Sequence, residues 1–418
     1  MIYTKLNLQM FNNTQTTLLN TTGNDLSPEM KTFYDKQLIR TAQANLVHDQ
    51  FGMKRPIPKG GGKTIEFRKY DPFKKAGTLT EGVTPDGHKL NVSTITATVA
   101  QYGDYVEISD MLDLTAIDNN LVEATTLCGD QAGETLDSVT RDVITAGTNV
   151  IIAPAVSGGT ETAISARSSI TAASTLRPKE IRKAAAKLKR VNAKPFDGGY
   201  YVGIVHPDEE CDLIGDSEWI EAHKYCRPEE MYKGEIGQIA GVRFVRSSLA
   251  KIFGPKEIGS GYSRLTVKTA ISSSSTSVVV NEVLESVSGV SIPVYIDGNA
   301  NVVTAITKGS GQSTLTIQTA ISSLSVGDIV CGQGGGADGS AVYATLILGK
   351  NAYGVTEVSG GGLQHIVKQL GSAGSADPLN QRATSGWKAT KTAERLTEAY
   401  MVRIEHSSAE FGSIAQAN

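Results

Sequence analysis

A glycine-rich run at residues 59–64 (Lys-Gly-Gly-Gly-Lys-Thr) is the first stretch whose residue types could do chemistry. Gly-Lys-Thr ends the phosphate-binding loop of many nucleotide-dependent enzymes. The full motif needs a glycine five positions before Gly62, where this chain has Ile57. A strand pattern follows the run, so no helix N-terminus would receive a phosphate. The run therefore predicts a flexible hinge in preference to a nucleotide site.

Residue types that ligate metals are concentrated in a second region. They are His206, Asp208, Cys211, His223 and Cys226. Their spacings match no standard zinc pattern, and no second Cys or His pair accompanies His223 and Cys226. The sequence also lacks Gly-x-Ser-x-Gly, and none of its six histidines stands in a catalytic setting. We therefore expect structural side chains here, and a protein without catalytic residues, cofactor or metal ion.

The composition argues against a general affinity for nucleic acid. The 418 residues carry a formal net charge of −3, so any DNA contact must be local. Four scattered cysteines suggest reduced thiols in a cytoplasmic setting. The first residues show no secretion signal, and no segment reaches the ~18 apolar residues of a membrane span. We expect a soluble protein.

The elements that position side chains are organised around residues 63–114. Two alternating strand patterns flank a turn at residues 85–87 (Pro-Asp-Gly), which predicts a long β-hairpin. The return strand changes its apolar phase twice, and each change predicts a bulge or bend, the second at Gly103. Residues 88–108 could span on the order of 60 Å at ~3.3 Å per residue. The hairpin should therefore project from the body and lie on a neighbouring subunit.

Helices are predicted on both sides of this hairpin. After a polar arm at residues 1–26, one helix begins at Ser27 and ends near Gly52. A second helix covers residues 118–146, and Cys128 on its apolar stripe should be a buried small hydrophobe. A third covers residues 177–191, and shorter helices follow His206 and cover residues 229–239. The outer side of the third helix is basic and consists of Lys179, Arg182, Lys183, Lys187, Lys189 and Arg190. Such a side could meet DNA phosphates, although a charged helix side is more often solvated.

Strand patterns fill most of the remaining chain. They predict strands at residues 200–205, 241–247, 341–348, 353–356, 363–368, 383–391 and 396–406, the last with one buried face. Between residues 256 and 339 the chain is rich in Ser, Thr, Val and Gly and holds an internal repeat. Residues 265–273 return as residues 315–323, with seven of nine positions identical. We expect a small all-β module inserted between Phe253 and Ala341.

Several runs resemble the major capsid proteins of tailed double-stranded DNA bacteriophages, and in particular their N4-like branch. The runs are residues 79–87 (Leu-Thr-Glu-Gly-Val-Thr-Pro-Asp-Gly), 101–114 (Gln-Tyr-Gly-Asp-Tyr-Val-Glu-Ile-Ser-Asp-Met-Leu-Asp-Leu), 133–142 (Gly-Glu-Thr-Leu-Asp-Ser-Val-Thr-Arg-Asp) and 380–388 (Asn-Gln-Arg-Ala-Thr-Ser-Gly-Trp-Lys). The resemblance covers most of the chain outside residues 256–339, and the hairpin run at residues 79–87 is the most distinctive.

The resemblance implies an α+β fold, the tailed-phage major capsid fold of the Hong Kong 97 type. That fold has an N-terminal arm, an extended loop, a peripheral domain with a spine helix, and an axial domain, here with an inserted all-β domain. The expected divisions are residues 1–52 for the N-terminal arm and helix, 53–110 for the extended loop hairpin, 111–150 for the spine helix of the peripheral domain, 151–255 and 341–378 for the two parts of the axial domain, 256–340 for the inserted all-β domain, and 379–418 for the terminal strands of the peripheral domain.

The function that the resemblance implies is structural. Copies of the chain would assemble as pentamers and hexamers into an icosahedral shell around the phage DNA, which they would contact non-specifically. Portal, scaffold or decoration proteins are further expected partners, and a membrane is not. The location would be the virion capsid, assembled in the bacterial host cytoplasm. Two alternatives stay open: a cellular nanocompartment shell of the same fold, and a virion adhesin or glycan-binding protein that acts through residues 256–340.

Overall fold

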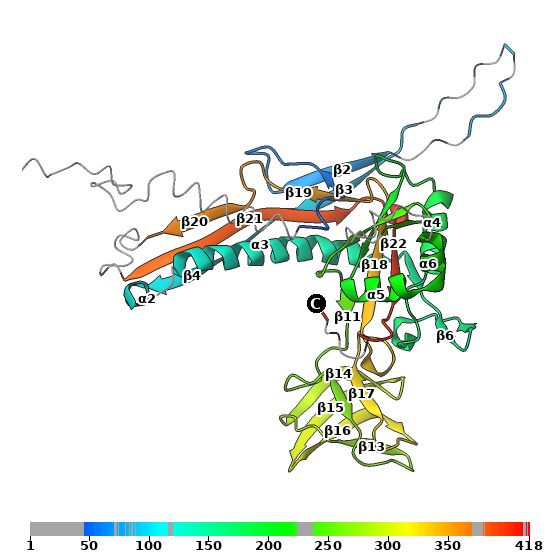
Figure 1. Cartoon of the computed structure of the whole chain (residues 1–418), viewed down its shortest axis with the longest axis vertical. Coiled ribbons are helices and arrows are strands. Elements are labelled where there is room, and N and C mark those ends of the chain that lie inside the picture. The colour runs from blue at the N-terminus through cyan, green and yellow to red at the C-terminus, as the bar shows by residue number, and fades with distance from the viewer. Residues whose placement is uncertain are drawn as a thin grey trace, which may run out of the picture.

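The computed structural model describes residues 46–418 apart from gaps at 71–72, 74, 80, 83, 85–86, 88, 116–119, 224–236, 370–378, 380, 413–414 and 416. The predicted arm, most of the helix that should end near Gly52, the turn at residues 85–86 and most of the helix predicted at residues 229–239 lie outside the described residues. Figure 1 shows a long blade of strands backed by a helix, a central body, a projecting hairpin and a separate β domain. In the described part of the chain, no helix is long and apolar enough to cross a membrane.

The blade is a five-stranded sheet built on β21 (Arg382–Arg395), which pairs antiparallel with three other strands. The remaining strands are β1 (Met53–Lys54), β4 (Ala100–Ser109), β19 (Tyr353–Thr356) and β20 (Gln364–Lys368). The ladder between β4 and β21 is uninterrupted, so the bulge predicted at Gly103 is wrong. Gly103 serves a different purpose, because a Cβ there would lie 2.6 Å from the carbonyl oxygen of Trp387.

Helix α3 (Asn120–Thr145) covers one face of the blade, which confirms the helix predicted at residues 118–146 (Figure 1). Its apolar stripe packs against Trp387 and Ala389 of β21, and Cys128 is buried as predicted. The buried members of the stripe are Ala124, Cys128, Ala132 and Leu136. A short helix that the sequence did not predict, α2 (Asp110–Thr115), follows β4.

The base of the hairpin is a regular ladder between β2 (Thr64–Tyr70) and β3 (Val92–Thr98), which confirms the two predicted strands. No bulge interrupts it, so the first predicted bulge is also wrong. The return chain instead changes partner, because β3 pairs with β2 and β4 pairs with β21. Phe67 anchors the base on the blade, since it is buried and a Cβ on Gly354 of β19 would lie 2.8 Å from its ring.

The body contains a seven-stranded sheet with the order β5-β22-β18-β8-β10-β9, and β11 pairs with β18. The strands are β5 (Val150–Ile152), β8 (Tyr201–Val205), β9 (Gln238–Ile239), β10 (Val242–Arg246), β11 (Ile252–Phe253), β18 (Val342–Leu348) and β22 (Met401–His406). Thus residues 238–239, predicted as the end of a helix, form a strand. The accompanying shorter elements are β6 (Ala155–Ser157), β7 (Thr160–Thr162), α4 (Pro178–Arg190), α5 (Pro207–Gly215) and α6 (Ser217–His223).

Strand β22 is buried on both faces, so the single buried face predicted for it is wrong. Val402 and Ile404 share a core with Ile181 and Leu188 of α4. Met401 points to the opposite core, together with Ile144 near the end of α3. Because a helix covers each face of the sheet at this strand, both sets of alternating side chains leave water.

Strand pairing divides the chain differently from the expected ranges. Strand β22 lies in the range expected for the peripheral domain, 379–418, yet it pairs with β18 in the body. Strands β19 and β20 lie in the range expected for the axial domain, 341–378, yet both pair with β21 in the blade. The chain crosses from body to blade after β18 and returns before β22, and local strand patterns carry no information about such long-range pairing.

The β domain is a six-stranded sheet with the order β12-β17-β14-β15-β16-β13, which confirms the predicted all-β module. Its strands are β12 (Arg264–Thr266), β13 (Ser275–Val280), β14 (Val287–Ile296), β15 (Asn299–Gly309), β16 (Gln312–Ile321) and β17 (Ile329–Gly332). A bridge between Val267 and Val280 joins the two ends of the sheet, so the strands close into a barrel. The two copies of the repeat place equivalent residues in the core, namely Leu265 and Val267 of the first copy and Leu315 and Ile317 of the second.

Candidate assembly interfaces

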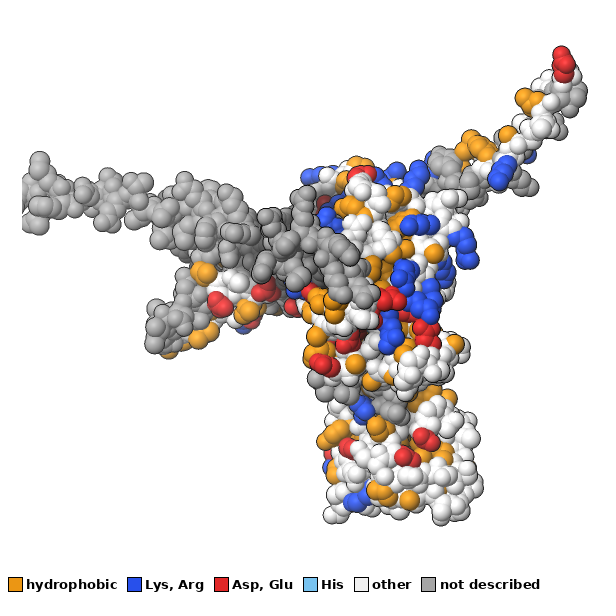
Figure 2. Space-filling view, turned by 45° about the vertical axis from the view of Figure 1, so that its right-hand side comes forward, with side chains coloured by type: hydrophobic (Ala, Val, Ile, Leu, Met, Phe, Trp, Pro, Cys, Tyr) orange, Lys and Arg blue, Asp and Glu red, His pale blue; other side chains and the backbone are white. Residues whose placement is uncertain are grey.

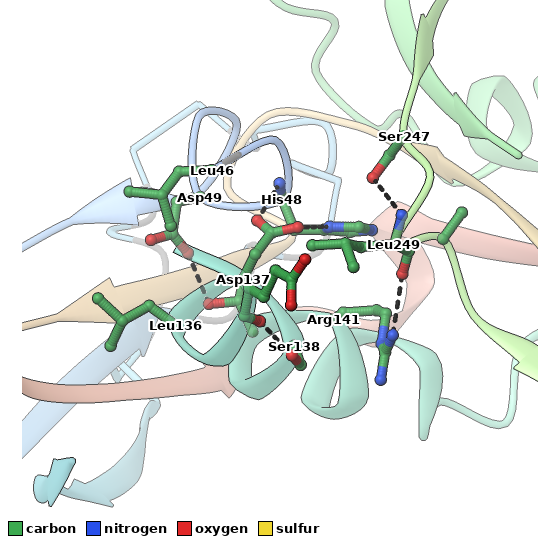
Figure 3. Close-up of polar contacts among 12 residues, drawn as sticks. Leu46, His48, Asp49, Leu136, Asp137, Ser138, Arg141, Ser247 and Leu249 are labelled. Carbon is green, nitrogen blue, oxygen red and sulfur yellow. Dashed lines mark hydrogen bonds and ion pairs between the residues drawn. The ribbon is translucent and has the colours of Figure 1, made fainter. Parts of the chain in front are cut away.

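A buried polar cluster, which we call the clamp, fastens residues 48–49 to α3 and the blade (Figure 3). His48 is fully buried, and its Nδ1 lies 2.6 Å from Asp137 Oδ2 on α3. The backbone N–H of His48 donates to Asp137 Oδ1 at 2.8 Å. The Tyr353 hydroxyl on β19 donates to the carbonyl oxygen of His48. The clamp therefore fixes the start of the described chain to both layers of the blade.

A second pair of side chains completes the clamp. Asp49 accepts from Thr140 Oγ1 at 2.6 Å and forms an ion pair with Lys391 of β21. Lys391 Nζ also donates to the carbonyl oxygen of Leu136 at 2.7 Å. Burial lowers the pKa of Lys391, and the charge of Asp49 opposes that shift. Our sequence analysis missed these residues, although Asp137 and Thr140 interrupt the apolar side of a predicted helix and could have indicated them.

The hairpin presents large apolar side chains to solvent. The described residues beyond the β2–β3 ladder extend far from the body (Figure 1). The exposed fractions are 61% for Phe73, 76% for Leu79, 64% for Leu90 and 46% for Val92. Such side chains at the end of a thin arm are typical of a segment that packs against another molecule.

Among the described residues, the face of the blade opposite α3 is uncovered and contains a shallow groove of about 830 Å³. Tyr105 on β4 and Ile366 on β20 lie on either side of Gly386, and they are 63% and 41% exposed. Gly386 lets the backbones of β4 and β21 approach closely, because a Cβ there would lie 2.6 Å from the Cβ of Tyr105. Charged residues border the groove, namely Glu107, Lys368, Arg382 and Lys388. A partner that fits this groove would have apolar side chains with polar flanks.

The basic side predicted for residues 177–191 lies on α4, whose opposite side is buried in the body. Figure 2 shows Lys and Arg side chains gathered on the body between the hairpin and the barrel. Some of the α4 cations are neutralised, as by the ion pair of 2.8 Å between Arg182 and Glu218.

The structure shows the surroundings of the residues first considered for chemistry, where it describes them. The run at residues 59–64 is a turn that leads into β2, with φ of 85° at Gly60 and 87° at Gly62. His206 caps α5, because its Nδ1 accepts from the Asp208 N–H at 3.2 Å, and burial lowers its pKa. Asp208 accepts from the Tyr343 hydroxyl at 2.6 Å, and Cys211 is exposed.

The structure does not show where the side chains of the other two potential metal ligands lie. The side chain of His223 and the whole of Cys226 lie outside the described residues. Among the side chains that are described, no group of three or more His, Cys, Asp and Glu could hold a metal ion.

Comparison with known proteins gives both a family match and a fold match. Residues 92–220, from the return strand of the hairpin to α6, match the family model described as phage capsid protein. The capsid of the cyanophage P-SCSP1u has a TM-score of 0.51 and 11% identity, over 86% of this chain and 87% of that chain. The capsid of Ralstonia phage GP4 has a TM-score of 0.50 and 11% identity, over 87% and 88%. No curated protein matches the sequence. The chain thus has the α+β fold of Hong Kong 97-type phage capsid proteins, as predicted.

Proposed function

We propose that the chain is a phage major capsid protein that self-assembles into an icosahedral shell enclosing a DNA genome. The observation that carries the proposal is a capsid fold over nearly the whole chain combined with a long arm whose apolar side chains are exposed. In a shell, the neighbouring subunit would cover those side chains. Burial of apolar surface at many identical contacts, each of modest strength, then stabilises a closed assembly.

The proposal also names the two surfaces through which neighbouring copies contact each other. The hairpin of one copy lies along the open face of the blade of the next, with Leu79 and Leu90 near the groove between Tyr105 and Ile366. Each side of this contact offers exposed apolar side chains within a polar surround, which is the usual anatomy of a protein interface. The buried Phe67 holds the base of the hairpin against β19 of the blade, and the clamp fixes the chain that leads to it, which limits the directions in which the arm can reach.

We include in the same proposal the form of the assembly, its partners, its location and its branch of the family. Assembly as pentamers and hexamers, non-specific contact with packaged DNA and further contacts with portal, scaffold or decoration proteins follow from the resemblance to tailed-phage capsid proteins. Assembly in the bacterial host cytoplasm has the same support. Membership of the N4-like branch rests on the resemblance of residues 79–87, 101–114, 133–142 and 380–388. The expected division into peripheral and axial domains is retained, with β19 and β20 moved to the blade and β22 to the body.

Mass photometry of the recombinant chain, backed by negative-stain images, tests the proposal. The full chain should form capsomer rings or megadalton shells, and a chain lacking residues 77–88 should remain as subunits. Leu79→Asp should weaken assembly without unfolding the subunit, whereas Thr84→Asp on the same arm is the matched control. If the full chain stays at the subunit mass when it is expressed with its neighbouring genes, the proposal is wrong.

A cellular nanocompartment would pass the same assembly test, so the contents of native particles decide between the two. A phage shell should contain double-stranded DNA that is resistant to nuclease, and a nanocompartment should contain a cargo protein instead. Binding of glycans by the isolated barrel would support the adhesin alternative.

A further inference from the structure

The cations of α4 fall into two groups that differ in their surroundings. In the first half, Lys179 pairs with Glu161 at 2.6 Å, Arg182 with Glu218 at 2.8 Å and Lys183 with Glu180 at 3.2 Å. In the second half the charges are Lys187, Lys189 and Arg190, followed by Lys194. Within the described part of the chain, no carboxylate lies within 4.0 Å of these four cations. The positive charge of the helix is therefore concentrated at its C-terminal half.

This half of α4 is a rigid support for its charges. Ile181, Ala184 and Leu188 on the inner side are fully buried in the core of the body. The Lys189 ammonium lies over the turn before β10, 4.0 Å from the place that a Cβ on Gly241 would occupy. Because the backbone is already fixed, binding to this surface costs little ordering of the chain.

The composition of the surface favours a phosphate backbone over a protein as its partner. The centres of protein interfaces are depleted in Lys and enriched in aromatic residues. Here four cations are gathered within eight residues, and Val191, which is 38% exposed, is the large apolar side chain among them. Lys and Arg in such a row neutralise consecutive phosphates and release counterions, and this needs no base sequence.

We propose that the C-terminal half of α4, with Lys194, is the surface that contacts the phosphate backbone of double-stranded DNA. The inference rests on the proposed function, because a capsid shell brings the chain against packaged DNA. The whole chain has a formal net charge of −3, so its contact with DNA must come from such a local surface. The contact is independent of sequence and weakens steeply with salt.

Fluorescence anisotropy with a labelled DNA duplex and the full-length chain, at 50 to 200 mM NaCl, tests this surface. The variant K187Q/K189Q/R190Q should lose at least about tenfold in affinity and about 2.7 in the slope of log K against log salt, because each lost phosphate contact removes ~0.9. The matched control K179Q/R182Q/K183Q removes the same charge from the same helix. Its affinity should change less than about threefold, because ion pairs already occupy those cations.

Assembly of both variants, followed by mass photometry, distinguishes a failure of the proposed DNA surface from a failure of the proposed capsid function. Shells that form while both variants bind DNA equally would overturn this inference and leave the proposed function intact. If the C-terminal variant alone fails to assemble and keeps its affinity for DNA, the surface is a contact between copies, and the inference is also wrong. Failure of the unaltered chain to assemble would count against the proposed function, whereas the DNA measurement would still decide the inference.

Discussion

Glu209 of α5 and His406 of β22 form a fully buried pair in the body. His406 Nδ1 contacts a carboxylate oxygen of Glu209, and its Nε2 lies 2.8 Å from Thr345 Oγ1. Burial raises the pKa of Glu209 well above 4.5, and nearby Asp212 and Asp208 add to this shift. Burial also lowers the pKa of His406 to about 3. One proton therefore lies between the two groups over a wide range of pH.

This pair should give the subunit a maximum of stability between pH 4.5 and 6.5, the ordinary pKa values of the two groups. Below pH 4.5 the unfolded chain binds two protons and the folded pair one, so acid destabilises the fold. Above pH 6.5 the unfolded groups bind none and the folded pair still binds one, so base also destabilises it. Each limb should slope by up to about 1.4 kcal/mol per pH unit.

Urea unfolding of the subunit from pH 4 to 8 measures this profile. Replacing the pair by Glu209→Gln and His406→Gln should flatten both limbs relative to the unaltered chain. Glu218→Gln removes an exposed carboxylate of the neighbouring helix and should leave the profile unchanged. Parallel profiles for the chain and the double variant would refute the shared proton.

The clamp gives a second prediction at the scale of residues. Asp137→Ala leaves the buried His48 ring and N–H without their acceptor, so it should lower the free energy of unfolding by about 3–5 kcal/mol. Glu134→Ala is the control on the same helix. Its side chain is exposed, so the loss should stay below about 1 kcal/mol. Equal losses in urea unfolding would mean that the clamp adds nothing specific.

At the scale of elements, the β4–β21 ladder depends on close backbone approach at Gly103. Gly103→Ala would place a Cβ 2.6 Å from the Trp387 carbonyl oxygen, where neither strand can move without losing hydrogen bonds. We expect a loss of about 1–3 kcal/mol in urea unfolding. Gly77→Ala on the projecting arm meets no atom within 4 Å and should be nearly neutral. A neutral Gly103→Ala would show that the ladder can separate at this point.

At the scale of the whole molecule, the barrel and the body have separate hydrophobic cores. The barrel has its own closed core, and the chain enters and leaves it at adjacent points. Phe253 pairs with Val342, and the Lys256 N–H donates to the Gln333 carbonyl oxygen at 3.2 Å. Replacing residues 257–331 by Gly-Ser-Gly should therefore preserve the fold of body and blade.

Circular dichroism and urea unfolding of the shortened chain test this separation, with the full chain as reference. The midpoint for the body should not change, and shells should still form if the barrel is a surface decoration. An insoluble or unfolded product would show that the barrel core and the body fold as one unit.

The sequence by itself determined the local elements and, through the resemblance of a few runs, the fold. Apolar spacing located α3 and α4, the hairpin strands and the barrel, because each depends on a periodic pattern within one segment. Only the tertiary structure decided which sheet each late strand joins, the regular ladder at Gly103 and the clamp. Those features arise from pairing between residues far apart in the chain, for instance His48 with Asp137 and β4 with β21. Their energies depend on burial and close approach, which a linear pattern does not contain.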